Sequence, residues 1–313
     1  MYRISLRNMI VIPSGKYSRL FSEFIYLIHK DCNNLSIYVY PEHILFYSKN
    51  IDTNITFKMS LESSWFYTYD YHSIQNQYVK IHVKMLIPLL SNIYENHSIF
   101  IDILSNHTIH IEMKNIEPEN TIIKSCIIPY TIINRYEPSK NIDIEEYNHI
   151  QLSPNHLYHL FKQLYLSNNQ ISIHCDENLI IFKSYNIDTS SDNESTENES
   201  DYSDDCNTNN HQLHSLNTDL RIEIPQHTLH YYNFNHNVYN NVFNLDQLIH
   251  ILNIPHSTLF TQFSTFISHN KSLDFIYYIH NPNIVTEMET SSSYTPITNP
   301  TNSIHIQIQP THE

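Results

Sequence analysis

Residues 59–93 read MSLESSWFYTYDYHSIQNQYVKIHVKMLIPLLSNI, and the order of patterns in this stretch decides the fold. The alternation typical of a half-buried strand runs into the sequence Phe66-Tyr67-Thr68-Tyr69. A second strand pattern at residues 78–83 leads directly into an apolar helical stretch at residues 85–93. The sequence therefore predicts two strands and a helix that follows the second strand without a loop.

Strand-like alternation extends from this stretch over the first half of the chain. The apolar runs recur about every ten residues, which is typical of an antiparallel meander. Two stretches with helical periodicity, residues 16–29 and 85–94, interrupt them. The predicted strands of this half are residues 2–6, 35–40, 43–48, 55–61, 79–83, 98–103 and 108–113.

The second half repeats the plan. Its helices are predicted at residues 154–166, where Ser153 and Pro154 form a typical helix start, and at residues 245–252. Two helices among many strands in each half indicate an internal duplication. The predicted strands are residues 149–152, 170–174, 179–184, 220–224, 238–243, 258–267, 272–279 and 303–309.

Composition excludes several classes of function. Gly15 is the single glycine of the 313 residues. Nucleotide-binding loops need several glycines, so they are excluded, and turns must rely on asparagine instead. We find no catalytic motif and predict neither an enzyme nor a cofactor. The four cysteines, Cys32, Cys126, Cys175 and Cys206, form no C-x-x-C pair and are expected to be free thiols.

Charge and hydropathy suggest an intracellular protein without a membrane segment. No apolar run approaches the roughly 18 residues that a membrane span needs, and the N-terminal apolar stretch is too short for a signal peptide. The formal net charge is −15, but residues 188–205 hold eight acidic residues and no basic one. Without them the charge is −7. We expect residues 187–210 to be a disordered acidic insertion and the Ser/Thr/Pro-rich residues 286–302 to be mobile.

Several segments, taken in order, resemble the proliferating cell nuclear antigen (PCNA) family of DNA sliding clamps. MYRISL resembles the opening strand, GKYSRLFSEFIYLIHKD the first helix, and ILFYSKNIDTNITFKMSLESSWFYTY the strand pair that follows. EEYNHIQLSPNHLYHLFKQLYLSNNQISIHCDENLIIF resembles the start of the second domain, YNNVFNLDQLIHILNIPHSTLFTQFS the last helix, and SIHIQIQP the closing strand. The biased composition suits a divergent member encoded by a large DNA virus.

The resemblance implies an α+β fold of two similar clamp domains. Residues 1–128 would form the first, residues 129–146 an interdomain connector, and residues 147–313 the second. Antiparallel sheets would lie outside, and four helices would line a DNA-facing surface. Three copies would close a ring around duplex DNA and tether a DNA polymerase for processive replication. A clamp loader and a nuclear or cytoplasmic replication site are further implications.

The polar faces of the predicted helices are the candidate DNA contact. At 100° per residue, basic side chains fall opposite the apolar stripe of three of the four helices. His156 and His159 share one helix face, but no third ligand accompanies them, so we predict no metal site. The alternative is that all these groups are ordinary solvated residues. The predicted DNA-facing set is Lys16, Arg19, Lys30, Lys84, His156, His159, Lys162 and His250.

The connector resembles the family's docking site for short peptides of polymerases and repair proteins. Ile132, Ile133, Tyr136, Ile142 and Ile144 would supply an apolar ridge, or would instead simply pack on the sheets. Lys49 and Asn50 stand where the family has an apolar–acidic pair near this pocket, which implies a different peptide specificity.

Two alternative functions follow from other features. Subunit-pairing edge strands are expected at residues 107–113 and at residues 179–184 or 211–216. Since the acidic insertion lies beside the latter, its charge opposes pairing and favours a monomeric clamp-fold processivity or transcription accessory factor. A β-rich structural or capsid-type protein is the alternative of another class. The regularly placed helices argue against it, because a jelly roll has nearly uninterrupted strands.

Overall fold

The computed structural model describes residues 8–71, 78–104, 106–115, 121–133, 146–184, 220–253, 260–268, 272–280 and 302–311. The predicted strand at residues 2–6 and the predicted disordered insertion lie outside these ranges. Of the predicted mobile segment 286–302, only Asn302 is described. It is buried, and its Oδ1 accepts a hydrogen bond of 2.8 Å from the Glu62 amide.

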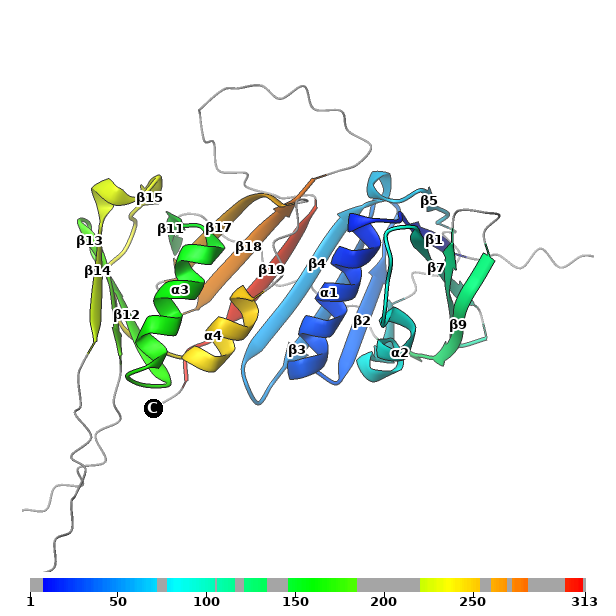
Figure 1. Cartoon of the computed structure of the whole chain (residues 1–313), viewed down its shortest axis with the longest axis horizontal. Helices are drawn as coiled ribbons and strands as arrows, with labels where there is room; N and C mark the ends of the chain where they lie inside the picture. The colour runs from blue at the N-terminus through cyan, green and yellow to red at the C-terminus, as the bar shows by residue number, and fades with distance from the viewer. Residues whose placement is uncertain are drawn as a thin grey trace, which may run out of the picture.

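One ten-stranded antiparallel sheet runs through both halves of the chain (Figure 1). Eight of its ten strands correspond closely to predicted ones, whereas the two short edge strands β10 and β15 were not predicted. In sheet order they are β10 (Thr131–Ile132), β6 (Tyr78–His82), β2 (Asn34–Val39), β3 (His43–Asn50), β4 (Ile55–Glu62), β19 (Ser303–Ile308), β18 (Leu273–Ile279), β17 (Phe260–Ser268), β11 (Tyr147–Gln151) and β15 (Tyr231–Asn233).

Two smaller sheets flank it, one at each end of the molecule (Figure 1). The first is built in the order β5 (Thr68–Tyr69), β1 (Asn8–Ile12), β7 (His97–Leu104), β8 (Thr108–Asn115) and β9 (Thr121–Pro129). The second is built in the order β14 (Arg221–Pro225), β13 (Leu179–Ser184), β12 (Gln170–Cys175) and β16 (Val238–Asn244).

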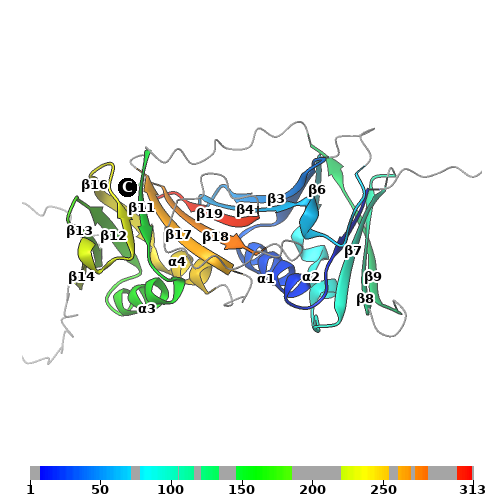
Figure 2. The same ribbon diagram turned by 90° about the horizontal axis from the view of Figure 1, so that it is seen from above.

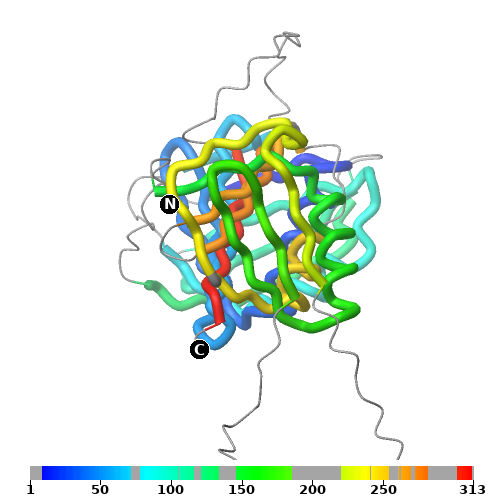
Figure 3. The backbone as a smooth tube through the Cα atoms, turned by 90° about the vertical axis from the view of Figure 1, so that its left-hand side faces the viewer, coloured from blue at the N-terminus to red at the C-terminus, as the bar shows by residue number. Residues whose placement is uncertain are grey.

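The closing strand β19 joins the two halves. Ile306 lies opposite Phe57 of β4 on one side and Phe275 of β18 on the other, and all three side chains are fully buried. Figure 3 looks along the long axis and shows β19 in red among the strands of both halves. The predicted domain boundaries stay a prediction, since this sheet is continuous and residues 134–145 lie outside the described ranges.

The aromatic stretch from which the fold was predicted is an anchor in the first half. Phe66 is buried, and Thr68 and Tyr69 pair with Val11 and Ile10 of β1. The Tyr69 hydroxyl lies 2.6 Å from the Tyr40 carbonyl oxygen and 2.8 Å from that of His43. The stretch therefore connects the smaller sheet to the turn between β2 and β3.

Four α-helices lie on the same side of the ten-stranded sheet (Figure 2). They are α1 (Lys16–Asp31), α2 (Ile87–Leu90), α3 (Pro154–Tyr165) and α4 (Leu245–Leu252). In α1 the apolar stripe at helical spacing, including Leu20, Phe24 and Ile28, is buried against the sheet. The predicted start of α3 is confirmed, because the Ser153 hydroxyl accepts a hydrogen bond of 3.2 Å from the His156 amide.

The prediction for the second helix was wrong in length. The predicted helix at residues 85–94 is a single α-turn, and Lys84 lies before it in the 3₁₀ turn Val83–Met85. The helix ends because Ser91 is extended and Asn92 adopts a positive φ of 59°. The Lys124 ammonium then donates to the Ser91 carbonyl oxygen at 2.6 Å. Asn92 and likewise Asn54, at φ 53°, confirm that asparagine takes glycine's role in turns.

The edge strands predicted at residues 107–113 and 179–184 were also wrong, and the alternative at residues 211–216 lies outside the described residues. β8, close to predicted residues 107–113, lies between β7 and β9, and β13 lies between β12 and β14. Instead, β9 is an edge strand of the first smaller sheet, and β14 is an edge strand of the second. The sequence of β9, TIIKSCIIP, carries its isoleucines in adjacent pairs instead of alternating them, and six of its nine residues are exposed while only Ile128 is buried. Its pattern is that of an edge and was not recognised as a strand.

Candidate nucleic-acid interface

Seven of the eight predicted DNA-facing residues are exposed on the helix side of the molecule. Lys16, Arg19 and Lys30 lie on α1, Lys84 precedes α2, and His156, His159 and Lys162 lie on α3. The four helices and the 3₁₀ turn together contain five Lys or Arg residues and three Asp or Glu residues, in a chain of net charge −15. The helix layer is therefore a locally cationic part of an acidic protein.

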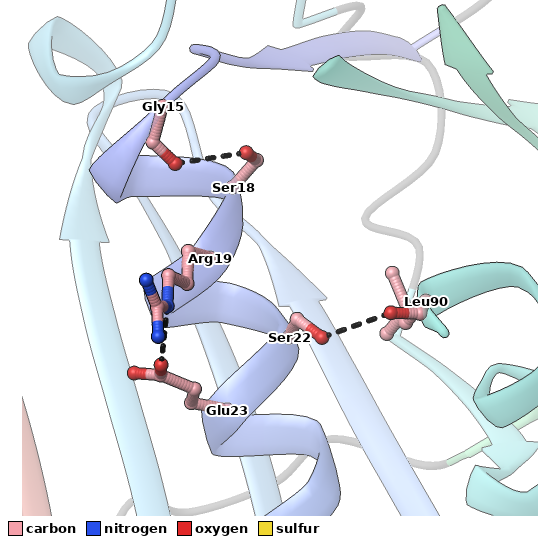
Figure 4. Close-up of polar contacts among 6 residues, drawn as sticks. All are labelled: Gly15, Ser18, Arg19, Ser22, Glu23 and Leu90. Atoms are coloured by element: carbon pink, nitrogen blue, oxygen red, sulfur yellow. Dashed lines mark hydrogen bonds and ion pairs between the residues drawn. The ribbon is translucent and has the colours of Figure 1, made fainter. Parts of the chain in front are cut away.

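Two cations lie at the beginning of α1, one near an aromatic ring and the other paired with a carboxylate. The Lys16 ammonium lies 5.6 Å from the centre of the Tyr17 ring, whereas the Arg19 Nε donates to Glu23 Oε1 at 3.0 Å (Figure 4). Desolvation raises the pKa of the Glu23 carboxyl, and the Arg19 guanidinium partly opposes this. An exposed i,i+4 pair is weak, so a phosphate can compete for Arg19.

Side-chain hydroxyls of α1 hold the short α2 in place. The Ser22 hydroxyl donates to the Leu90 carbonyl oxygen at 3.2 Å, as Figure 4 shows, and the Tyr26 hydroxyl donates to that of Ile87 at 3.4 Å. A helix of four residues leaves most of its carbonyls without intrahelical partners, and the Ser22 hydroxyl supplies one to Leu90, whereas the Ile87 carbonyl oxygen also accepts from the Ser91 amide at 3.0 Å. The two hydroxyl contacts also fix the turn that carries Lys84.

The α3 face combines one lysine with two histidines. The Lys162 ammonium lies 4.9 Å from the centre of the Tyr158 ring, within the range of a cation–π contact. His156 and His159 are exposed on the same helix, so Lys162 is the one permanent cation that α3 presents.

His250, the eighth residue of the predicted set, is less exposed than the helical spacing predicts. Its side chain, which extends from α4 to the end of α1, is only 18% exposed. Its Nδ1 is 3.2 Å from the Lys30 ammonium, and its Nε2 is 3.4 Å from Asp31 Oδ2. Asp31 was not predicted as part of this site, because no local pattern shows that residues 220 positions apart meet.

Of the predicted docking ridge, the structure describes two residues. Ile132 of β10 is 62% exposed, and the Ile133 amide donates to the Tyr78 carbonyl oxygen at 3.0 Å. Tyr136, Ile142 and Ile144 lie outside the described residues. Ile132 is thus an exposed apolar residue on the edge strand β10 of the ten-stranded sheet.

The described part of the chain offers no sign of two other kinds of site. There, no group of three His, Cys, Asp or Glu side chains is arranged to hold a metal ion. No helix within the same ranges is long and apolar enough to cross a membrane. Cys32, Cys126 and Cys175 are free thiols, and burial raises the pKa of each.

Comparison with solved structures identifies the fold as that of a sliding clamp. PCNA from Thermococcus kodakaraensis matches with a TM-score of 0.66 and 12% identity over 97% of this chain and 99% of that one. A PCNA2–PCNA3 complex from Sulfolobus tokodaii gives a TM-score of 0.63 and 9% identity over 97% and 98%. No protein-family model and no curated protein matches the sequence. The chain thus has a PCNA-like clamp fold.

Proposed function

We propose that this protein is a non-enzymatic, sliding-clamp-like DNA polymerase processivity factor. The observation that carries the proposal is the match to PCNA structures over 97% of the chain. A clamp works by topology, so it tethers a polymerase without binding any particular base. Replication at a nuclear or cytoplasmic site, and viral origin, are parts of the proposal that rest on the sequence resemblance.

The helix layer supplies the chemistry for contact with duplex DNA. Phosphate contacts from Lys and Arg are insensitive to sequence, which suits a protein that must slide. Lys16, Arg19, Lys84 and Lys162 are exposed, and the helices on which or just before which they lie, α1, α2 and α3, are on one side of the sheet (Figure 2). Few contacts suffice, because a closed ring does not need tight binding.

A homotrimeric ring would use the two free sheet edges. β9 and β14 lie in the smaller sheets at opposite ends of the molecule, so one copy can pair head to tail with the next (Figure 1). Ile122, Ile123 and Ile127 of β9 are 52%, 43% and 64% exposed, a costly arrangement for an edge strand that stays unpaired. Partner proteins would dock short peptides near Ile132 and the connector, and a clamp loader would open the ring.

Reversing the charge of the helix layer tests the DNA-facing assignment. The variant Lys16→Glu/Arg19→Glu/Lys84→Glu should abolish stimulation of a polymerase on long primed templates while the thermal unfolding temperature stays close to that of the wild type. The control, Lys58→Glu/Lys183→Glu, reverses charge on strands β4 and β13 and should retain stimulation. Equal stimulation by both variants would refute the DNA-facing assignment.

Solution mass tests the ring. Light scattering behind a sizing column should give about three times the chain mass of 37.2 kDa. The variant Ile123→Lys, which places a charge in the exposed edge β9, should shift the mass to that of one chain. If the wild type is a monomer and still stimulates the polymerase, the ring is refuted and the alternative of a monomeric clamp-fold processivity factor is supported.

A further inference from the structure

Three charged or titratable side chains meet where the helix layers of the two halves of the chain touch. Lys30 and Asp31 end α1, and His250 lies in the last turn of α4. The Lys30 Nζ is 3.2 Å from His250 Nδ1, and His250 Nε2 is 3.4 Å from Asp31 Oδ2. The imidazole therefore stands between a cation and an anion of the other half.

The contact with Lys30 fixes the state of the ring. An ammonium group can only donate, so His250 Nδ1 must be the acceptor, and the neutral ring then carries its proton on Nε2. That N–H faces Asp31 Oδ2, but neither atom has a well-formed hydrogen bond, although both are buried. The neutral ring thus forms a hydrogen bond with Lys30 but no well-formed hydrogen bond with Asp31.

A second proton on the ring would reverse this preference. Nδ1 would become a donor and would repel the Lys30 ammonium, whereas the imidazolium would form an ion pair with Asp31. The formal charge of the three groups would rise from zero to +1. Lys30, which is exposed, would be released to solvent and to any phosphate near the helix layer.

The other groups around the ring do not provide a competing partner among the described residues. In α1, His29 is adjacent in sequence, and its buried Nδ1 has no hydrogen-bond partner. In α4, Asp246 lies one turn earlier and accepts a hydrogen bond from Tyr165 of α3. In β3, the Asn50 amide donates to the Asp31 carbonyl oxygen rather than to its carboxylate.

We propose that His250 is a positioning residue that holds Lys30 away from DNA when neutral and releases it when protonated. This inference rests on the proposed function and extends it, because it makes the strength of the clamp's contact with the phosphate backbone depend on pH. The ligand is the backbone of duplex DNA, read without regard to sequence.

Salt dependence of DNA binding tests the proposal directly. The slope of log affinity against log salt for a short duplex should be measured at about pH 8 and about pH 5.5, which bracket imidazole titration. In the wild type, lowering the pH should steepen the slope by about 0.9 for each additional phosphate that the protein neutralises. The His250→Gln variant should lack the part of this steepening that corresponds to one phosphate. His227→Gln, which removes an exposed imidazole outside the helix layer, should behave as the wild type.

A Lys30→Met background separates positioning from direct contact. If His250 acts through Lys30, adding His250→Gln to Lys30→Met should change neither slope further. A further change there would mean that His250 itself contacts DNA, and it would overturn the positioning role. Equal pH responses of wild type and His250→Gln, with DNA bound in both, would refute this inference alone. Absence of DNA binding by the wild type at either pH would refute the proposed function and this inference with it.

Discussion

The helix pairs of the two halves lie on the same side of one sheet but carry different kinds of charge. The first pair, with the turn before α2, holds Lys16, Arg19, Lys30 and Lys84, which stay charged at any physiological pH. The second pair holds a single lysine, Lys162, and otherwise His156, His159 and His250. The cations of the first pair are therefore permanent, whereas the second pair has one permanent cation and three histidines.

The comparison teaches that one architecture can be repeated while its surface chemistry diverges. The buried stripes of α1 and α3 are alike, with Phe24 and Phe161 each only 1% exposed above the sheet. Packing limits what can replace such residues, whereas exposed positions are free to change. Substitutions in the core should therefore affect both halves alike, and substitutions on the surface should distinguish them.

The largest effect is expected from the shared core. Phe24→Ala and Phe161→Ala should each lower the free energy of unfolding by about 3–5 kcal/mol, because each leaves a cavity. Since β19 pairs with strands of both halves, both variants should lower one common calorimetric transition. Leu166→Ala, at an 87% exposed position, is the control and should change the transition little. Two separate transitions, each moved by only one variant, would show instead that the halves unfold independently.

A smaller effect should distinguish the second half in acid. His149 of β11 is 3% exposed, stacks on Phe266 at 4.3 Å and has no hydrogen-bond partner on either ring nitrogen. Desolvation lowers its pKa to about 4. The folded state therefore stays neutral where the unfolded state already binds a proton. The stability present above about pH 6.5 is lost progressively as the pH falls towards 4.

This loss should amount to roughly 3 kcal/mol, from a pKa change of about 2.5 units at 1.36 kcal/mol each. Urea unfolding of the wild type and of His149→Phe at several pH values would measure it. The phenylalanine variant keeps the stack on Phe266 and should lose less stability between pH 6.5 and 4. Parallel curves for the two proteins would contradict the assignment to His149.

Local patterns predicted most of the fold. The strands with clean alternation, such as β4 and β19, and the helix with both cap and stripe, α3, appear within one or two residues of their predicted bounds. α2 was predicted too long, since its end depends on Lys124, which arrives from β9. β9 itself was missed because its isoleucines stand in adjacent pairs, so that its sequence lacks the alternation of a half-buried strand.

The candidate site was predictable only in part. Helical spacing placed Lys16, Arg19 and Lys162 correctly on exposed faces, because that property depends on one helix alone. Spacing could not show that Arg19 is engaged by Glu23, or that His250 meets Lys30 and Asp31, because a pairing also depends on rotamers and on how helices pack. Lys16 and His156 therefore allow the sharpest test of the difference between the halves.

The smallest effect is expected from single exposed residues of the two helix pairs. Lys16→Met removes a permanent cation and should reduce the salt slope of duplex binding by about 0.9 at both about pH 8 and about pH 5.5. His156→Gln, at an exposed histidine of the second pair, should reduce the slope less than Lys16→Met does, because a lysine is charged throughout this pH range. The same fluorescence-anisotropy titrations measure both variants. An effect of His156→Gln as large as that of Lys16→Met would contradict the difference between the two helix pairs. No effect of Lys16→Met at either pH would place the DNA path away from the start of α1, while leaving Lys30 and Lys84 as its cations in the first half.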